Sequence, residues 1–479
     1  MKSMITTDED IGMAERTSAR HGVDRWSVVT CLLLVPLASG ADPEWVAGDH
    51  HIHSLHSSDG FYPVEQNARM ALQHGLDWIV TTDHGGPRQS HLRILQAYPD
   101  LIAARKAIPD LIQFYGMELD SPGADHSSII VPHTANEANV IFAIESSFSK
   151  NDPVPKDPLR DKPEHMIAAL KFMGALRDKP VLIANHASRK NKIVNGKVVY
   201  GLDDPAELRL WNDTAPEVAV GMEGAPGHQA RGLRNLPRGS YSLQPTYGGF
   251  DRLAAKRGGF WDSMLAEGRH WWITATSDSH RHITDPPGSD FWPGEYSKTY
   301  VWAEREYEAI LQGLRRGNVF VTTGDLISEL YVTAEVAGSG NAVGIGETLT
   351  IPAGATVDVT VRFLDPSTTN SNGDSPQVSR VDIITGTVTG PLPPDKMATD
   401  SASTKVAESF TAARWTSAGK YRTATWSWKN VTADAYLRVR GTNGTEMEPL
   451  ADVLGEDPWQ DLWFYSNPIF LQLAERDHR

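Results

Sequence analysis

The chain has 479 residues, 40% hydrophobic and 22% charged, a composition typical of a globular protein; its length exceeds what one hydrophobic core supports, so we expect two domains. The formal net charge of −15 argues against a nucleic-acid polymer as the main partner, because phosphate backbones are bound by basic surfaces. The single cysteine, Cys31, excludes a disulfide framework and a cysteine-ligated zinc site.

Residues 1–41 have the pattern of an N-terminal extension ending in a signal peptide. Arg25 precedes an apolar run over 26–37, and small residues follow up to Ala41. The run is shorter than the ~20 apolar residues of a membrane span, so we expect no stable membrane insertion. A buried first helix is the alternative, but Pro36 and the small residues favour cleavage. We therefore predict a periplasmic or secreted protein.

Helix-period and strand-period patterns alternate between about Ala47 and Thr323. The predicted helices, each with the strand that follows it, cover 63–75 and 78–81, 163–173 and 181–184, and 260–265 and 271–274. A last helix is predicted over 307–317. Repeated helix–strand units with fully apolar strands predict a parallel sheet covered on both faces, either open or closed into a barrel. Imidazole or carboxylate residues follow the strands, at the edge where such folds place their active sites.

The pattern changes beyond about residue 325. Residues 357–363 and 435–440 alternate with period two, which is typical of half-buried strands, and loops rich in Ser, Thr, Pro and Gly lie between them. This part has one histidine, His478, and no cluster of metal-ligating residues, so a packing or capping role is favoured over a second active site. The predicted domains are the extension with its signal peptide (1–41), an α/β domain (45–324) and a β-sandwich-like domain (325–479).

Histidines and carboxylates occur at the ends of five predicted strands in a definite order. The motifs are Gly48–Ser54 with Asp59 beyond it, Thr81–Gly85, Gly116–Asp120 with His126 beyond it, Ala184–His186 and Ser277–His280. His51 and His53 point to the same side of an extended strand, so both imidazoles can reach one metal ion. Asp278 and His280 repeat this spacing with one carboxylate. Such ligands suit Zn, Mn or Fe(II), and the sequence does not choose among them.

The ordered motifs resemble the polymerase and histidinol phosphatase (PHP) superfamily. Within it they look most like the carbaryl-hydrolase-like (CehA/McbA) subgroup, in which a Gly-Asp-x-His-x-His-Ser opening is common. Residues 314–317, 319–324 and 467–471 also resemble that subgroup, so the resemblance covers about residues 47–471. It implies an α/β fold, a distorted (β/α)7 PHP barrel followed by the β-sandwich-like domain.

The resemblance also implies a set of ligands for three divalent metal ions. The first ion would be held by His51, His53, Glu118 and Asp278; Glu118 would bridge to a second, completed by His126 and His186; the third would be held by Asp59, His84 and His280. The spacing from His53 to Asp59 is one residue longer than in the commonest family form. His56 is therefore an alternative to Asp59 as a ligand.

The metal set predicts a metal-dependent hydrolase of a small phosphomonoester or phosphodiester. A hydroxide bridging two cations would be the nucleophile, and the third cation would hold a substrate oxygen. Glu118, Asp278 and His282 are the predicted catalytic residues, with His282 or a metal-bound water as the proton donor to the leaving oxygen. One alternative is an aryl carbamate or carboxylic ester hydrolase. An alternative from another class is a non-catalytic, metal-stabilised surface binding protein. The sequence leaves the exact substrate and the oligomeric state open.

Several residues beside the ligands are candidates for other roles. Arg189, Arg281 and His228 are predicted to contact the substrate, although the arginines, like Lys190, can equally be solvated surface charges. Asp49 and Asp83 suit the support of neighbouring ligands, and Glu223 can be a pocket or a structural residue. His50 is expected to be packed or hydrogen-bonded rather than a ligand.

Overall fold

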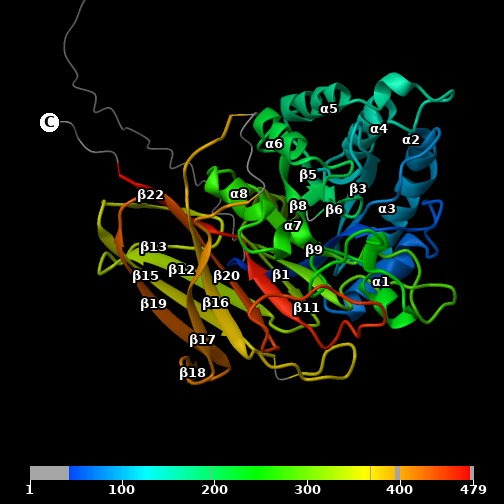
Figure 1. Ribbon diagram of the computed structural model, residues 1–479. Coiled ribbons are helices and arrows are strands. Elements are labelled where there is room, and N and C mark those ends of the chain that lie inside the picture. Colours follow the sequence, from blue (N-terminus) through cyan, green and yellow to red (C-terminus); the bar gives the residue numbers. More distant parts are fainter. Residues whose placement is uncertain (1–41, 196, 367, 394–399, 475–479) are drawn as a thin grey trace, which may run out of the picture. The chain divides into compact units, whose positions relative to one another are not determined.

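The computed structural model describes residues 42–474 except 196, 367 and 394–399 (Figure 1). The predicted extension and signal peptide, with Cys31, and also His478, lie outside the described residues. Within the described part of the chain, no helix combines the length and the apolar character of a membrane span.

The α/β part is built on a central, mostly parallel sheet. Its strands, in spatial order, are β10 (Ser297–Ala303), β1 (Glu44–Ile52), β2 (Trp78–Thr81), β3 (Ile112–Asp120), β4 (His126–Ile130), β5 (Val181–Asn185), β8 (Ala219–Pro226) and β9 (Trp272–Thr276). Strands β1, β2 and β3 are parallel, as are β5, β8 and β9. The predicted strands at 78–81, 181–184 and 271–274 are therefore present, and the α/β class with a mostly parallel sheet is confirmed.

The sheet differs from an ideal closed parallel barrel in two respects. Strand β4 runs antiparallel to both β3 and β5. The connection 121–125 is too short for the crossover that a parallel pair needs, so β3 and β4 form a hairpin. Strands β9 and β1 are joined at their carboxyl ends by the isolated Ile52–Ser279 bridge and by the His53 N–H, which donates to Ser279 O at 3.0 Å. Backbone hydrogen bonds among the described residues therefore do not close the barrel, and the seven-repeat arrangement stays a prediction.

Helices cover the outside of this sheet, with α5 and α6 beyond β5 and β8 (Figure 1). The described helices are α1 (Val64–Gln73), α2 (Gln89–Leu92), the π-helix η1 (Arg93–Ala97), α3 (Tyr98–Ala107), α4 (Glu137–Phe148), α5 (Pro163–Ala175), α6 (Pro205–Thr214), α7 (Arg252–Ala255), α8 (Phe260–Ala266) and α9 (Tyr307–Arg316), with short 3₁₀ turns η2 (Pro158–Arg160), η3 (Gln229–Arg234) and η4 (Arg238–Ser240). Pro163 begins α5, where a missing N–H costs nothing, and Gly317 ends α9 in the left-handed conformation. The four predicted helices are confirmed. A small hairpin, β6 (Lys192–Val194) and β7 (Lys197–Val199), follows β5.

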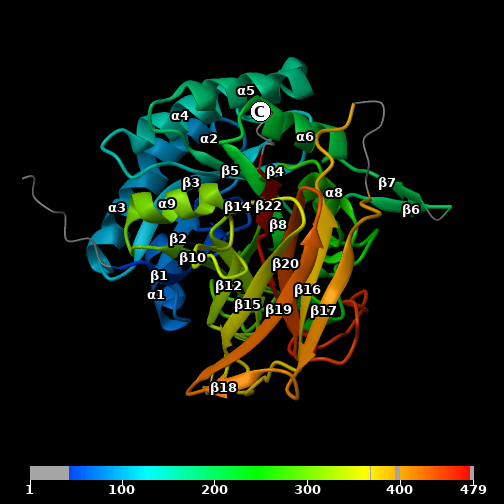
Figure 2. The ribbon, with the colours of Figure 1, turned by 90° about the vertical axis from the view of Figure 1, so that its left-hand side faces the viewer.

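The remaining strands form two β layers, seen side by side in Figure 2. One extends the central sheet from β10 through β11 (Val319–Thr323), β21 (Trp463–Ser466), β20 (Ala435–Thr442), β22 (Ile469–Leu473) and β14 (Thr348–Ile351), with β16 (Arg380–Thr387) and β17 (Lys405–Thr411) beside β20. The other contains β13 (Ala342–Val343), β12 (Glu329–Val336), β15 (Ala355–Leu364), β19 (Tyr421–Val431) and β18 (Thr416–Ala418). Their apolar faces share one core, as a β-sandwich does.

Strand β20 departs from the predicted half-buried alternation, because it is buried along its whole length. The Arg438 guanidinium lies in the interior, where it donates to both carboxylate oxygens of Asp262 on α8 at 2.8 Å. The alternation of polar and apolar residues predicted that one face of this strand is exposed. The prediction was wrong because Asp262 neutralises the Arg438 charge inside the protein. Strand β11, just before the predicted boundary at residue 325, pairs with β10 on one side and with β21, from beyond the boundary, on the other. The hydrogen bonding of the central sheet therefore continues from one predicted domain into the other. The division into two domains at that position stays a prediction.

Candidate metal centre

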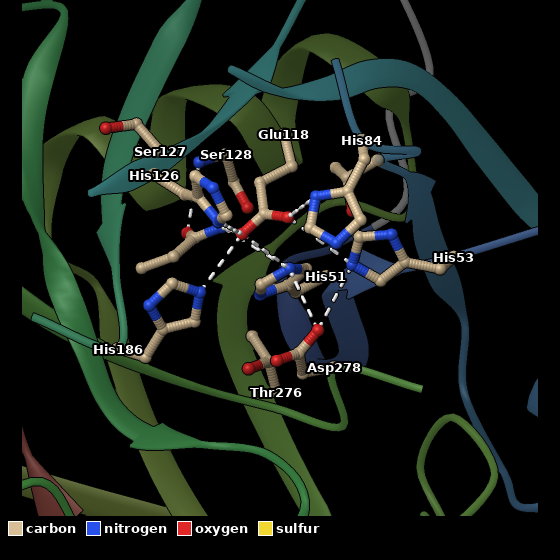
Figure 3. A network of polar contacts seen from close by, with 12 residues as sticks. His51, His53, His84, Glu118, His126, Ser127, Ser128, His186, Thr276 and Asp278 are labelled. Atoms are coloured by element: carbon tan, nitrogen blue, oxygen red, sulfur yellow. Dashed lines mark hydrogen bonds and ion pairs between the residues drawn. The ribbon is translucent and has the colours of Figure 1, made fainter. Parts of the chain in front are cut away.

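The structure brings all nine predicted ligands to one edge of the sheet. They lie at or just beyond the carboxyl ends of β1 (His51, His53, Asp59), β2 (His84), β3 (Glu118), β5 (His186) and β9 (Asp278, His280), with His126 at the start of the antiparallel β4. Figure 3 shows the Glu118 carboxylate among the imidazoles of His51, His53, His84, His126 and His186. Because parallel strands end at one edge of their sheet, residues separated by more than 200 positions meet there.

Glu118 is buried and lies at the centre of the cluster. Its Oε1 is 3.2 Å from His51 Nε2 and 3.1 Å from both His126 Nδ1 and His186 Nε2. Its Oε2 is 2.6 Å from His84 Nδ1. The hairpin explains why His126 takes part, since β3–β4 pairing places it opposite Asp120, two residues beyond Glu118. One carboxylate thus faces four imidazoles, an arrangement suited to bridging two cations.

Asp278 forms the second acidic centre. Its Oδ1 lies 3.1 Å from both His51 Nε2 and His53 Nε2. The backbone of Asp278 is left-handed, with φ of 46°, and so is that of His186, with φ of 35°. Such conformations cost about 1–3 kcal/mol each and cluster at functional sites. Gly227 passes so close that a Cβ there would lie 2.5 Å from the Asp278 Cβ, so this turn needs glycine.

Asp59, rather than His56, faces the third group of ligands. Asp59 lies 3.5 Å from His84 Nε2 and 3.6 Å from His280 Nε2 through its two carboxylate oxygens. Ligand atoms of Asp59, His53, His84 and His280 all lie within 4.8 Å of one another. The His56 ring instead makes an exposed contact of 2.9 Å between its Nε2 and Asp100 Oδ2. Of the two alternatives, the geometry favours Asp59.

Asp59→Asn is therefore expected to weaken the binding of one metal ion and to lower turnover on the order of 10²-fold, because an amide lacks the charge of the carboxylate ligand. His56→Ala removes only an exposed ion pair and should change both quantities by about twofold or less. Metal titration of each variant, with kcat at saturating metal, distinguishes the two assignments. The reverse ranking would identify His56 as the ligand.

Supporting hydrogen bonds fix which nitrogen of each imidazole faces the cluster. His51 Nδ1 donates to Glu223 Oε1 at 2.7 Å, which leaves the lone pair of Nε2 toward the ligand carboxylates. His53 Nδ1 lies 2.8 Å from Ser57 Oγ, which itself donates to Asp83 Oδ1 at 3.2 Å, so the imidazole must be the donor. His280 Nδ1 donates to the Asp278 carbonyl oxygen at 2.8 Å. All three Nε2 atoms are left as acceptors, as metal ligation requires.

The other predicted supporting residues also hold ligand-bearing segments. Asp49 accepts the backbone N–H groups of His51 and Ser277, each at 3.0 Å, and so ties β1 to β9. Glu223, for which pocket and structural roles were both possible, accepts the His186 N–H at 2.6 Å besides its bond to His51. His50 bonds Thr274 Oγ1 at 2.8 Å and contacts none of the nine ligands in the described structure, as expected of a packed histidine.

Electrostatics and unpaired atoms test whether these residues fit metal ions. Three buried atoms at the centre, His53 Nε2, Glu118 Oε2 and His186 Nδ1, make no hydrogen bond of good geometry among the described residues, although His84 Nδ1 lies 2.6 Å from Glu118 Oε2 and Asp278 Oδ1 lies 3.1 Å from His53 Nε2. Burial raises the pKa of Glu118, but the nearby imidazoles of His126, His84 and His51 outweigh it and hold the pKa well below the usual range. Burial lowers the pKa of His84, but the Glu118 and Asp59 carboxylates raise it to about 11. Ionised carboxylates that raise the pKa of a neighbouring imidazole form a site that attracts positive charge, and the residues fit divalent metals.

His282 is not brought to the cluster, and its predicted role as a proton donor is not supported. Its Nδ1 accepts the Thr284 N–H at 3.2 Å, so Nε2 carries the proton and donates to Glu295 Oε2 at 3.0 Å. The ring also stacks on Trp292. His282 adjoins the ligand His280 in the sequence, but the loop after β9 directs its ring toward Glu295 and Trp292.

His228 occupies the position beside the cluster instead. Its Nε2 lies 2.8 Å from Asp278 Oδ2 and its Nδ1 lies 2.6 Å from Asp290 Oδ1. Burial lowers the pKa of His228, but the Asp278 and Asp290 carboxylates outweigh it and raise the pKa to about 10. Asp290 also accepts the N–H groups of His280 and Arg281. Asp290 follows no apolar strand, so no sequence signal marked it as a functional residue. Only the fold places it beside His228.

A cavity of about 420 Å³ opens onto the ligands. His228 and the guanidinium-bearing residues Arg189, Arg231 and Arg281 line it. Arg189 is oriented by two hydrogen bonds to Asp125, and Arg281 lies over the Phe61 ring at 3.9 Å. Arg189, Arg281 and His228, the three predicted substrate contacts, thus all line this cavity. Lys190 is exposed and does not line this cavity, whereas Arg231 was not anticipated.

No protein-family model and no curated protein matches the chain. One similar solved structure is that of a two-domain protein from Bacteroides vulgatus ATCC 8482, described as containing a predicted PHP-like metal-dependent phosphoesterase. It has 15% sequence identity and a TM-score of 0.37, covering 86% of this chain and 96% of the other. A second, a candidate metal-dependent phosphoesterase from Bifidobacterium adolescentis ATCC 15703, has 15% identity and a TM-score of 0.26, covering 52% of this chain and 92% of the other. We therefore base the functional assignment on the residues of the site.

Proposed function

We propose that the protein is a metal-dependent phosphoesterase of the PHP type that hydrolyses a small phosphomonoester or phosphodiester. The observation that carries the proposal is the set of three imidazoles whose Nδ1 atoms are anchored while their Nε2 atoms face carboxylates, buried ones for His51 and His53 and the Asp59 carboxylate for His280. Ligand atoms gather in overlapping groups within 4.8 Å, among them His51–His53–Glu118, His84–Glu118–His126 and His53–Asp59–His84–His280. This grouping supports a centre of three ions, of Zn, Mn or Fe.

The nine ligands would hold the ions as the resemblance implies, with Glu118 shared between two of them. Bound divalent cations lower the pKa of water towards neutrality and neutralise charge on a phosphoryl group. The chain contributes positioning. Glu223 and Ser57 hold the rings of His51 and His53, and the His228–Asp290 pair holds the Asp278 carboxylate from the cavity side. These groups preorganise the site before substrate arrives.

The cavity wall supports an anionic substrate. Arg189 and Arg281 present guanidinium groups beside a deep acidic cluster, and guanidinium pairs well with phosphate oxygens. Arg189 is held by Asp125, so its direction is set before binding. A neutral carbamate or carboxylic ester has no comparable use for these charges. We therefore favour phosphate esters, with aryl carbamate or carboxylic ester hydrolysis as the alternative.

A turnover panel tests the proposal. Metal-loaded protein is assayed against a phosphomonoester, a phosphodiester, an aryl carboxylic ester and an aryl carbamate that share one chromogenic leaving group. We expect turnover of phosphate esters that is abolished by a chelator. Preference for the carboxylic ester or carbamate would establish the alternative chemistry, and metal binding without any turnover would support a non-catalytic binding protein.

We also propose that the mature protein is periplasmic or secreted, on the basis of the charged, apolar and small-residue order of residues 25–41. N-terminal sequencing of protein recovered from its native host should find a start near Ala41 or Asp42, in a fraction outside the cytoplasm. A cytoplasmic protein that retains residues 32–34 would contradict this.

A further inference from the structure

The helical segment that follows His84 has an inverted pattern of burial. Leu92 and Leu95 are 44% and 71% exposed, whereas Arg93, which lies between them in the sequence, is 1% exposed. A helix normally turns leucines inward and arginine outward. Breaks of this local rule tend to occur where function has imposed a residue.

The backbone has a local reason for this orientation. Residues 93–97 form the π-helix η1, and the Tyr98 N–H bonds to Arg93 O, five residues back. Pro99 follows at the start of α3. Proline has no N–H and its ring crowds the carbonyl four residues earlier, so a wider turn relieves the clash. The π turn offsets the face of α2 from that of α3 and directs Arg93 inward.

Inside the protein, the Arg93 guanidinium holds the loop that carries His84. Its Nη2 donates to the backbone oxygens of Asp83 at 2.9 Å and His84 at 2.8 Å. Its Nε donates to Glu145 Oε2 on α4 at 2.7 Å. The guanidinium is thus fixed by the buried Glu145 carboxylate and donates hydrogen bonds to two successive peptide oxygens of the β2–α2 connection.

Both residues on this connection serve the metal cluster. The His84 ring contacts Glu118 and Asp59, and the Asp83 carboxylate accepts Ser54 N–H at 2.6 Å and Ser57 Oγ, which in turn holds His53. A shift of this peptide would move His84, a ligand of the third ion. We propose that Arg93 is a positioning residue for that ion, acting through His84; the inference rests on the proposed metal-dependent function.

A second arginine on the same run of helix provides a matched control. Arg105 on α3 pairs with Glu137 of α4, as Arg93 pairs with Glu145, and its Nε donates to the backbone oxygen of Gln113 at 2.7 Å. Gln113 lies at the start of β3, away from the ligand-bearing edge. Arg105 therefore reproduces the ion pair and the carbonyl contact without touching a ligand loop.

The experiment compares Arg93→Lys with Arg105→Lys in the full-length protein. A lysine keeps the charge opposite the glutamate, but its ammonium cannot reproduce the planar fork to two carbonyls and a carboxylate. We expect Arg93→Lys to weaken the most loosely held ion by about 10–100-fold, so that dialysis against a graded chelator leaves one ion fewer than in wild type. Arg105→Lys should retain wild-type metal affinity.

Two further measurements separate positioning from general destabilisation. The Tm of each metal-free variant measures the structural cost, and the metal affinity is determined well below both values. In a His84→Ala background, Arg93→Lys should have little further effect on metal affinity, because the ligand through which it acts has gone. Should Arg93→Lys fail to fold, Glu145→Gln with Glu137→Gln as its control repeats the comparison.

The outcomes distinguish this inference from the proposed function. Equal metal affinity in Arg93→Lys and Arg105→Lys, in a wild type that binds metal and hydrolyses phosphate esters, would overturn only the role of Arg93. A wild type that binds no metal would overturn both.

Discussion

Glu118→Gln is expected to lower turnover by a factor on the order of 10³ or more, as when a metal-activated nucleophile is lost. The substitution keeps the shape of the side chain but removes the charge shared by its two oxygens. Glu118 Oε1 alone lies within 3.2 Å of three imidazole nitrogens, and Oε2 lies 2.6 Å from a fourth. An amide NH₂ on either side would repel a cation, so one ion should be lost or weakly held. Steady-state kinetics at saturating metal and elemental analysis measure both effects.

His50→Ala is the control for this prediction. His50 is as deeply buried as His51 and His53 and lies next to His51, yet its described hydrogen bond is to Thr274. Its loss should cost far less activity and no metal. Circular dichroism should show that both variants fold, since the surrounding core is apolar. If Glu118→Gln kept near-normal activity and full metal content while His50→Ala abolished both, the ligand assignment would be wrong.

Removal of metal is expected to reduce turnover to background and to lower the thermal stability of the protein. Protein purified without chelators should carry two to three transition-metal ions per chain, judging from the ligand groups. Without cations, the buried His53 Nε2 and Glu118 Oε2 face polar groups without making a hydrogen bond of good geometry. Ions present at 1,000 times their Kd would stabilise the folded state by about 4 kcal/mol. Elemental analysis and thermal unfolding before and after chelation measure this.

Restoration completes the metal test. Adding Zn or Mn to the stripped protein should recover both turnover and Tm, whereas Mg, which prefers oxygen ligands, should do so poorly. Metal retention should weaken as the pH falls, because protons compete for the same imidazole nitrogens. Metal content near zero in protein prepared without chelators, with no response to added Zn or Mn, would remove the basis of the proposed function.

Much of the site was predictable because its residues follow local rules. His51 and His53 share one face of a strand by period two, and parallel strands bring their carboxyl ends to one edge. The motifs at β2, β3, β5 and β9 therefore meet without any knowledge of the loops between them. The antiparallel direction of β4 did not disturb this result, because its hairpin returns His126 to the same edge.

The errors concern residues whose neighbours are distant in the sequence. His282 was expected to act at the cluster because it adjoins ligands in the sequence, but a loop turns it toward Glu295. Asp290 had no local signal, and it reaches His228 across 62 positions. Arg438 was expected on an exposed face, and it became buried because Asp262 on a helix compensates its charge.

The sequence by itself determined three helix–strand units and the last helix of the α/β part, and the identity of residues able to ligate metal, since hydrophobic period and strand-end position are properties of short segments. Only the tertiary structure favoured Asp59 over His56 and showed which imidazole nitrogen faces the cluster. It also decided that Arg93, rather than its neighbouring leucines, points inward. Each of these depends on a partner brought from elsewhere in the chain, such as Glu223 at 172 positions from His51 or Glu145 at 52 from Arg93. Hydrogen bonds over such separations leave no trace in local spacing, because the fold creates the proximity on which they depend.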